Sequence, residues 1–95
     1  MAQEVNKSVA RIAAMERCFD TVQWAMKKDA AAARHSAVFH ALVGQLRRYY
    51  EGVQWRKDFA MDEAGCLPPT LKRGVLSEDG VYNFLADYDA GMRGR

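Results

Sequence analysis

Residue types that carry catalytic or metal-binding chemistry are few in this sequence, and their spacing does not build a site. His35 and His40 are five positions apart, about 140° around a helix, so they cannot bind one metal ion together. His35 lies on an apolar stripe, which favours a hydrogen-bonded histidine in the core or at its boundary over a metal ligand. Cys18 also flanks a stripe and is typical of a small buried side chain, and nothing in the sequence activates Cys66 as a nucleophile. The sequence predicts no enzyme, no cofactor and no metal site.

Length and composition are those of one globular domain. The chain has 95 residues, of which 49% are apolar and 27% charged, close to the usual proportions. This length allows one core, so residues 1–95 are expected to form a single domain. No uncharged run approaches the roughly 20 residues that span a bilayer, so no membrane association is expected. The first residues lack the basic start and apolar stretch of a signal peptide, which predicts a cytoplasmic protein.

Apolar periodicity predicts an antiparallel helical hairpin in the first half of the chain. One stripe of apolar residues, at steps of three and four, predicts a helix over residues 4–28. A second stripe, out of phase with the first, predicts a helix over residues 30–51 with Asp29 as its N-cap. The alternative is a single bent helix of about 45 residues that pairs with another chain. It stays open because the turn between the stripes contains neither Gly nor Pro.

Two features indicate more apolar surface than one hairpin buries. The second helix carries large side chains on one face and small residues on the opposite face, so it can be buried on both sides. The small residues are Ala30, Ala33, Ala37, Ala41 and Gly44. Trp24 lies off the main stripe of the first helix, and a tryptophan is rarely left in water. We expect the chain after the hairpin, or a second subunit in a homodimer, to cover it.

Glycines and prolines interrupt the helical period over residues 52–76. The prediction for this segment is a long ordered loop with one or two short helical turns, around residues 58–64 and 69–72, because its apolar residues can hold it on the hairpin. A third helix is expected over residues 78–92, with Ser77 as its N-cap, Glu78 in its first turn and Gly91 as its C-terminal breaker. The predicted fold is all-α and three-helix bundle-like.

A distinctive string of residues follows the hairpin. It reads WRKDF at 55–59, DEAG at 62–65, LKRGVLSED at 71–79 and then Val81-Tyr82. This segment resembles a family of short bacterial proteins known only as domain of unknown function 4298, and the likeness is specific over residues 49–85. The resemblance implies a bacterial cytosolic protein with a small helical fold. It implies no activity, cofactor or catalytic residue.

The same segment has a structural and a functional interpretation. In the first, the acidic residues at 58 and 62 pair with the basic residues at 72 and 73 and tie the loop together, while the tryptophan closes the open end of the hairpin. In the second, the ordered loop presents its side chains to a protein partner. The candidate interaction residues are Trp24, Trp55, Arg56, Asp58, Lys72 and Arg73.

The distribution of charge bears on the partner. The net charge is +2, with eight Lys/Arg against four Asp/Glu in the first 50 residues and six against eight in the rest. Because the basic residues form isolated pairs, the balance does not favour nucleic acid. A basic hairpin can instead meet the acidic tail of a second copy. The sequence predicts a non-enzymatic protein–protein interaction module that self-associates. The alternative is a small regulator that contacts nucleic acid through Lys27, Lys28, Arg47 and Arg48.

Overall fold

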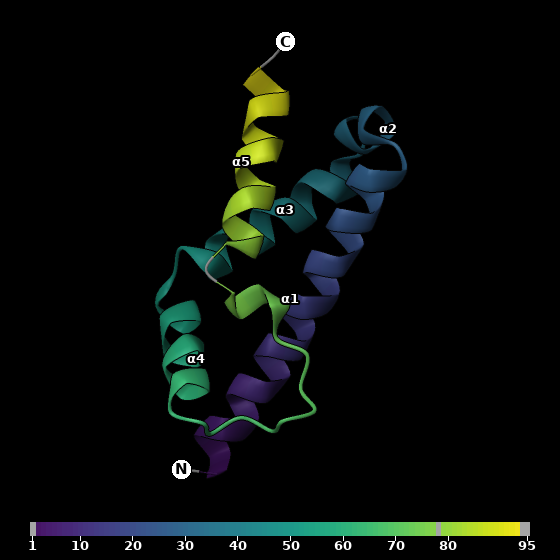
Figure 1. The fold of residues 1–95 in the computed structure, drawn as a ribbon. Coiled ribbons are helices and arrows are strands. Elements are labelled where there is room, and N and C mark those ends of the chain that lie inside the picture. The colour runs from purple at the N-terminus through teal and green to yellow at the C-terminus, as the bar shows by residue number, and fades with distance from the viewer. Residues whose placement is uncertain (1, 78, 94–95) are drawn as a thin grey trace.

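The computed structural model describes residues 2–77 and 79–93, and within them the chain is all-α (Figure 1). The described part contains five α-helices and one 3₁₀ turn. They are α1 (Ala2–Lys28), α2 (Ala30–Arg34), α3 (Ala37–Tyr50), α4 (Val53–Glu63), η1 (Gly74–Leu76) and α5 (Gly80–Arg93). The predicted fold class is confirmed, although the chain forms more helices than the three expected.

The predicted hairpin forms because the chain breaks at Asp29. Its side chain accepts the N–H of Ala32 at 3.1 Å and caps α2, which excludes the single bent helix. The helix predicted over residues 30–51 is itself broken. Ser36 has an extended backbone, and its hydroxyl accepts the N–H of Phe39 at 3.1 Å. A serine side chain that bonds the backbone locally competes with helix propagation, so α3 starts afresh here.

The loop predicted over residues 52–76 is wrong in its first half, where α4 forms, and the short helical turn expected around residues 58–64 is the last part of this longer helix. A glycine is the N-cap of this helix, and Gly65, with a φ of 73°, follows its last turn. The N–H groups of Gly65 and Cys66 bond to the carbonyls of Asp62 and Met61, each at 3.0 Å, which is the pattern of a Schellman motif. These glycines mark the two ends of a helix and not the interior of a loop.

The core lies between α1, α3, η1 and the first half of α5. The stripe predicted for the first helix faces it, and Ile12 and Val22 on α1 and Leu46 on α3 are fully buried. Phe19 on α1 meets Phe84 on α5 edge to face, with ring centroids 6.0 Å apart. The buried apolar residues are Ile12, Cys18, Phe19, Val22, Ala33, Phe39, Val43, Leu46, Tyr49, Leu67, Val75, Leu76, Val81, Phe84 and Leu85.

Helix α5 begins at Gly80, two residues after the predicted start, and ends at Arg93, within one residue of the predicted end. The hydroxyl of Ser77 accepts the N–H of Gly80 at 3.0 Å, as expected of an N-cap. Glu78, expected in the first turn, lies outside the described residues. Gly91 does not break the helix, because α5 continues through it. A Cβ at Gly91 would meet the guanidinium at the end of the flexible Arg34 side chain, so this guanidinium packs against α5 at the glycine.

The molecule is elongated because α1 runs along most of its length (Figure 1). Helix α4 and residues 64–73 lie by the N-terminal half of α1, and α5 lies by its C-terminal half. The chain measures 47 × 18 × 17 Å, and its radius of gyration of 14.2 Å exceeds the roughly 12 Å of a compact domain of this size. Within the described ranges, no helix is long and apolar enough to cross a membrane.

Candidate functional site

Asp58 on α4 is completely buried, and two side chains from other helices bind its carboxylate. Its carboxylate accepts two hydrogen bonds from Arg11 on α1, from Nε at 2.9 Å and from Nη2 at 2.6 Å. The hydroxyl of Tyr49 on α3 donates to the same carboxylate at 2.7 Å. Arg11 also donates to the hydroxyl of Ser8 at 3.2 Å. One buried ion pair therefore joins α1, α3 and α4.

Burial and the Asp58 carboxylate determine the protonation of this cluster. Loss of water around the phenol, together with the hydrogen bond to Asp58, raises the pKa of Tyr49 well above its usual range. The hydrogen bond to Asp58 also raises the pKa of Arg11. Both groups keep their protons at neutral pH and remain donors. Because the groups are committed to one another, the cluster orients helices and is poorly suited to proton transfer.

The predicted ties between the acidic and basic residues of the 55–79 string are half right. Arg73 pairs with Asp62 at 2.5 Å, as expected. Asp58 pairs with neither Lys72 nor Arg73, because it is buried in the core and forms its ion pair with Arg11. Lys72 instead reaches α1, where its ammonium lies 2.7 Å from the carboxylate of Asp20, and that hydrogen bond raises the pKa of Lys72. Residues 64–73 are therefore tied to both α4 and α1.

Both backbone polar groups of Val75, a fully buried residue, are bonded by side chains. Glu16 on α1 accepts the N–H of Val75 at 3.0 Å, and Trp55 on α4 donates its indole N–H to the carbonyl at 2.8 Å. The Trp55 ring also stacks on Phe59, with centroids 5.1 Å apart. These two hydrogen bonds hold η1 between α1 and α4. Trp55 is half-buried in this contact and serves the fold.

Sequence reasoning missed Arg11 and Glu16. Glu16 lies four residues after Ile12 and faces the buried side of α1, and a carboxylate at such a position is a usable signal, because a buried charge needs a partner. Arg11 offers no comparable signal. Its partner Asp58 is 47 residues away in the sequence, and nothing local indicates which of several carboxylates it binds.

The six candidate interaction residues do not gather on one surface. Asp58 is in the core, and Trp55, Lys72 and Arg73 hold the segment from α4 to η1 in place. Arg56 is exposed on α4. Trp24 is 62% exposed in the last turns of α1, and Figure 1 shows this end of α1 away from α4. Of the two covers expected for Trp24, the described residues after the hairpin do not supply one.

The two histidines are placed differently from expectation. His35, predicted in the core or at its boundary, is exposed at the C-cap of α2. His40 is half-buried, with Nε2 2.7 Å from the carbonyl of Arg34 and Nδ1 2.5 Å from the hydroxyl of Tyr88. Because a carbonyl only accepts, Nε2 carries the proton and Nδ1 accepts from Tyr88. His40 therefore links α2, α3 and α5 through hydrogen bonds.

The cysteines show no features of catalytic residues. Cys18 is buried as predicted, and its thiol donates to the carbonyl of Leu42 at 3.3 Å. Burial raises its pKa, which disfavours the reactive thiolate. Cys66 is exposed after the end of α4. Across residues 2–77 and 79–93, no group of three or more His, Cys, Asp or Glu side chains is placed to hold a metal ion.

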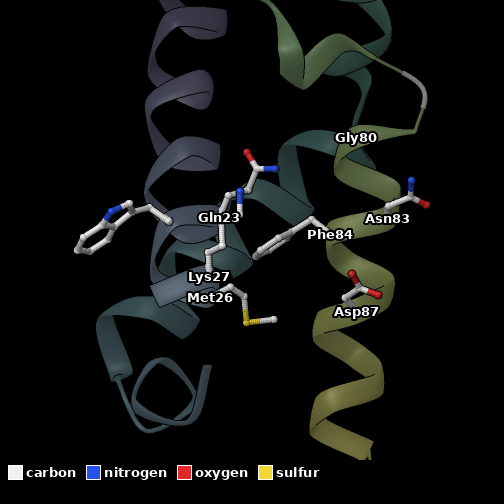
Figure 2. A pocket seen from close by; sticks show the side chains of 8 residues that line it. Gln23, Met26, Lys27, Gly80, Asn83, Phe84 and Asp87 are labelled. Carbon is white, nitrogen blue, oxygen red and sulfur yellow. The ribbon is translucent and has the colours of Figure 1, made fainter. Parts of the chain in front are cut away.

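An open groove of about 690 Å³ lies between the C-terminal part of α1 and the first half of α5. Met26 and Phe84 lie between the two helices, with Lys27 on the α1 side and Asp87 on the α5 side (Figure 2). Trp24 also borders the groove. The ammonium of Lys28 lies over the Trp24 ring, 4.7 Å from its centroid, as in a cation–π contact. The groove therefore has an apolar floor and walls of opposite charge.

The basic pairs proposed to contact nucleic acid are partly engaged within the fold. Arg47 binds Asp89 of α5 at 2.6 Å and lies 3.8 Å from Glu51. Lys28 lies over Trp24. Arg47 and Lys28, one residue of each pair, are therefore held in separate local contacts, which leaves fewer basic side chains free for phosphate binding.

Comparison with known proteins identifies a family for the chain. No curated protein and no solved structure matches the chain. A family's sequence model matches residues 12–93, which reaches well beyond residues 49–85 and takes in most of the helical hairpin. The matched region includes Asp58, Tyr49 and Glu16 but starts one residue after Arg11. The chain belongs to the family described as Domain of unknown function (DUF4298).

Proposed function

We propose that the chain is a non-enzymatic interaction module that self-associates as a symmetric dimer through the groove between α1 and α5. The observation that carries this proposal is Trp24, which is 62% exposed at the border of that groove. Tryptophan is among the residues most enriched at the energetic centres of protein interfaces. A second copy of the chain supplies the cover that the chain itself does not give.

The charges around the groove support a second copy as the occupant. In a two-fold dimer the same patch faces itself, so each contact occurs twice. Trp24 of one copy then enters the groove of the other, and Lys28 beside it approaches Asp87 on the opposite wall. Opposite charges placed on one patch make that patch complementary to itself.

The extent of exposed surface also supports association. The chain exposes 6065 Å², whereas a monomer of 10.7 kDa is expected to expose about 5,500 Å². The excess follows from the elongated shape, in which α5 leaves an open groove beside α1. An interface of ordinary size covers about 800 Å² on each partner, which is enough to bury this excess.

The test is the molar mass in solution, measured by light scattering during size-exclusion chromatography over a range of protein concentrations. We expect the wild type to reach twice 10.7 kDa at high concentration. Trp24→Ala should weaken the dimer about 30-fold, corresponding to about 2 kcal/mol for an interface hot spot.

The matched control is Val53→Ala, because Val53 on α4 is also 62% exposed but does not border the groove. This control should dimerise like the wild type. A wild type that stays at 10.7 kDa at every concentration, or a Val53→Ala variant that dissociates as readily as Trp24→Ala, would overturn the proposal.

A further inference from the structure

A second pocket, of about 340 Å³, lies between α1 and α3 and extends to the start of α4. Its lining includes two arginines, Arg11 and Arg48, and two glutamines, Gln45 and Gln54. Met15 contributes an apolar wall, and none of the lining residues is acidic. The volume is within the range of small-molecule sites. The pocket shares no lining residue with the groove between α1 and α5.

One of the two guanidinium groups is held rigidly. Arg11 uses Nε and Nη2 to bind the buried Asp58, and Nη2 also contacts Ser8. Among the hydrogen bonds of the described residues, its Nη1 has no partner, so this nitrogen can donate to a ligand. A donor fixed by its neighbours loses little conformational freedom when it binds, which favours affinity.

The guanidinium of Arg48 supplies the net positive charge of the pocket. Because Asp58 neutralises Arg11, the positive field of the pocket comes from Arg48. In the part of the chain that the structure describes, Arg48 has no carboxylate within ion-pair distance, whereas the neighbouring Arg47 has Asp89 and Glu51. Arg48 is therefore the basic residue of this pair that is available to an anion.

We propose that this pocket binds a small oxyanion, a phosphate ester or a carboxylate, attached to an apolar body. The planar fork of an arginine matches the oxygens of both groups, and the amides of Gln45 and Gln54 can donate further hydrogen bonds. Met15 and the ring of Tyr49 offer apolar contact to the rest of the ligand. The start of α4 adds the positive end of a helix dipole to the same field.

The experiment titrates the full chain, at constant ionic strength, with phenyl phosphate, benzoate and phenol, and follows amide and methyl NMR signals. We expect phenyl phosphate or benzoate to shift the side-chain amide signals of Gln45 and Gln54 and the methyl signal of Met15. The tighter of the two ligands identifies the preferred oxyanion. Phenol, which lacks the charge, should bind at least tenfold more weakly.

Two arginine variants decide whether the pocket is responsible. Arg48→Gln should weaken binding at least tenfold, whereas Arg56→Gln, at an exposed arginine outside the pocket, should leave binding unchanged. Equal weakening by both variants, equal binding of phenol, or the absence of shifts with either anion would overturn the proposal. Trp24→Ala should bind the ligands like the wild type, so this result is independent of dimerisation.

Discussion

Arg11 and Asp58 form a two-pronged ion pair that joins the first turns of α1 to the centre of α4, with N–O distances of 2.9 and 2.6 Å. The carboxylate is wholly buried, and Tyr49 donates a third hydrogen bond to it. A buried charge is tolerated only where its partners are complete. This pair therefore requires α1, α3 and α4 to be in place together, which makes it a point where the fold is specified.

Removing the carboxylate should destabilise the chain strongly. Asp58→Ala leaves Arg11 without its counter-ion and Tyr49 without its acceptor, and breaking a buried pair costs about 3 kcal/mol or more. The measurement is urea unfolding followed by circular dichroism. Glu63→Gln, which alters an exposed carboxylate on the same helix, is the control and should unfold like the wild type. Equal stability of Asp58→Ala and the wild type would contradict the assigned role of the pair.

Alkaline pH should destabilise the fold through Tyr49. The pKa of Tyr49 is raised in the folded chain, so its contribution to stability is complete below pH 10, near the ordinary pKa of tyrosine. Above that pH the unfolded chain releases the proton while the folded chain keeps it. The free energy of unfolding should therefore fall with pH by up to about 1.4 kcal/mol per unit from this group.

The measurement is urea unfolding at several pH values between 9 and 11. Tyr49→Phe should show a shallower loss of stability over this range than the wild type, because the titrating group is gone. Tyr82→Phe, at a tyrosine that is 61% exposed, serves as the control and should keep the wild-type slope. The lysines titrate over the same pH range in the wild type and both variants. The contribution of Tyr49 is therefore the difference between the wild type and Tyr49→Phe in the slope of unfolding free energy against pH. Identical slopes for Tyr49→Phe and the wild type would refute the assignment.

Two carboxylates one turn apart on α1 should differ in their effect on stability. Glu16→Ala leaves the buried N–H of Val75 without an acceptor, which costs about 2 kcal/mol. Asp20→Ala removes only the exposed hydrogen bond to Lys72 and should change the unfolding midpoint little. Limited proteolysis should also cut Glu16→Ala faster within residues 64–73. Equal stabilities of the two variants would show that the Val75 contact contributes little.

Exchange of charges tests the arrangement proposed for the dimer. Lys28→Glu and Asp87→Lys should each weaken association, because each places like charges together across the two-fold interface. The double variant restores opposite charges and should recover most of the affinity. Molar mass as a function of concentration measures this directly. A double variant as weak as the sum of the single ones would mean that Lys28 and Asp87 do not meet in the dimer.

The hairpin was predictable because its determinants are local. Asp29 caps α2 through an N–H three residues away, and the apolar stripe of α1 repeats at the helical period over its whole length. Ser77 at the start of α5 is the same kind of signal. The break at Ser36 is also determined locally, by its capping hydrogen bond. It was not predicted, because the apolar stripe continues through this position and indicates one uninterrupted helix over residues 30–51.

Helix α4 was missed because its buried residue is Asp58. Apolar periodicity recognises a helix by a stripe of apolar side chains, and a charged residue at the centre of the buried face removes that signal. The flanking glycines were informative, but whether a glycine begins a helix, ends it or lies in a loop depends on its backbone conformation. The φ of 73° at Gly65 is a property of the folded chain.

The features of the candidate sites also fall into two groups, those that nearby residues determine and those that need contacts between distant residues. The sequence alone determined the helical class and its first helix, and it marked Trp24 as a side chain in need of cover, because each depends on residues within a few turns of one another. Tertiary structure alone decided that Arg11 binds Asp58, that Glu16 binds Val75, and that Arg48 and Gln54 line one pocket. These contacts join residues far apart in the sequence. The sequence contains several possible partners for each charged side chain, and only the packing of the helices brings one of them within hydrogen-bond distance.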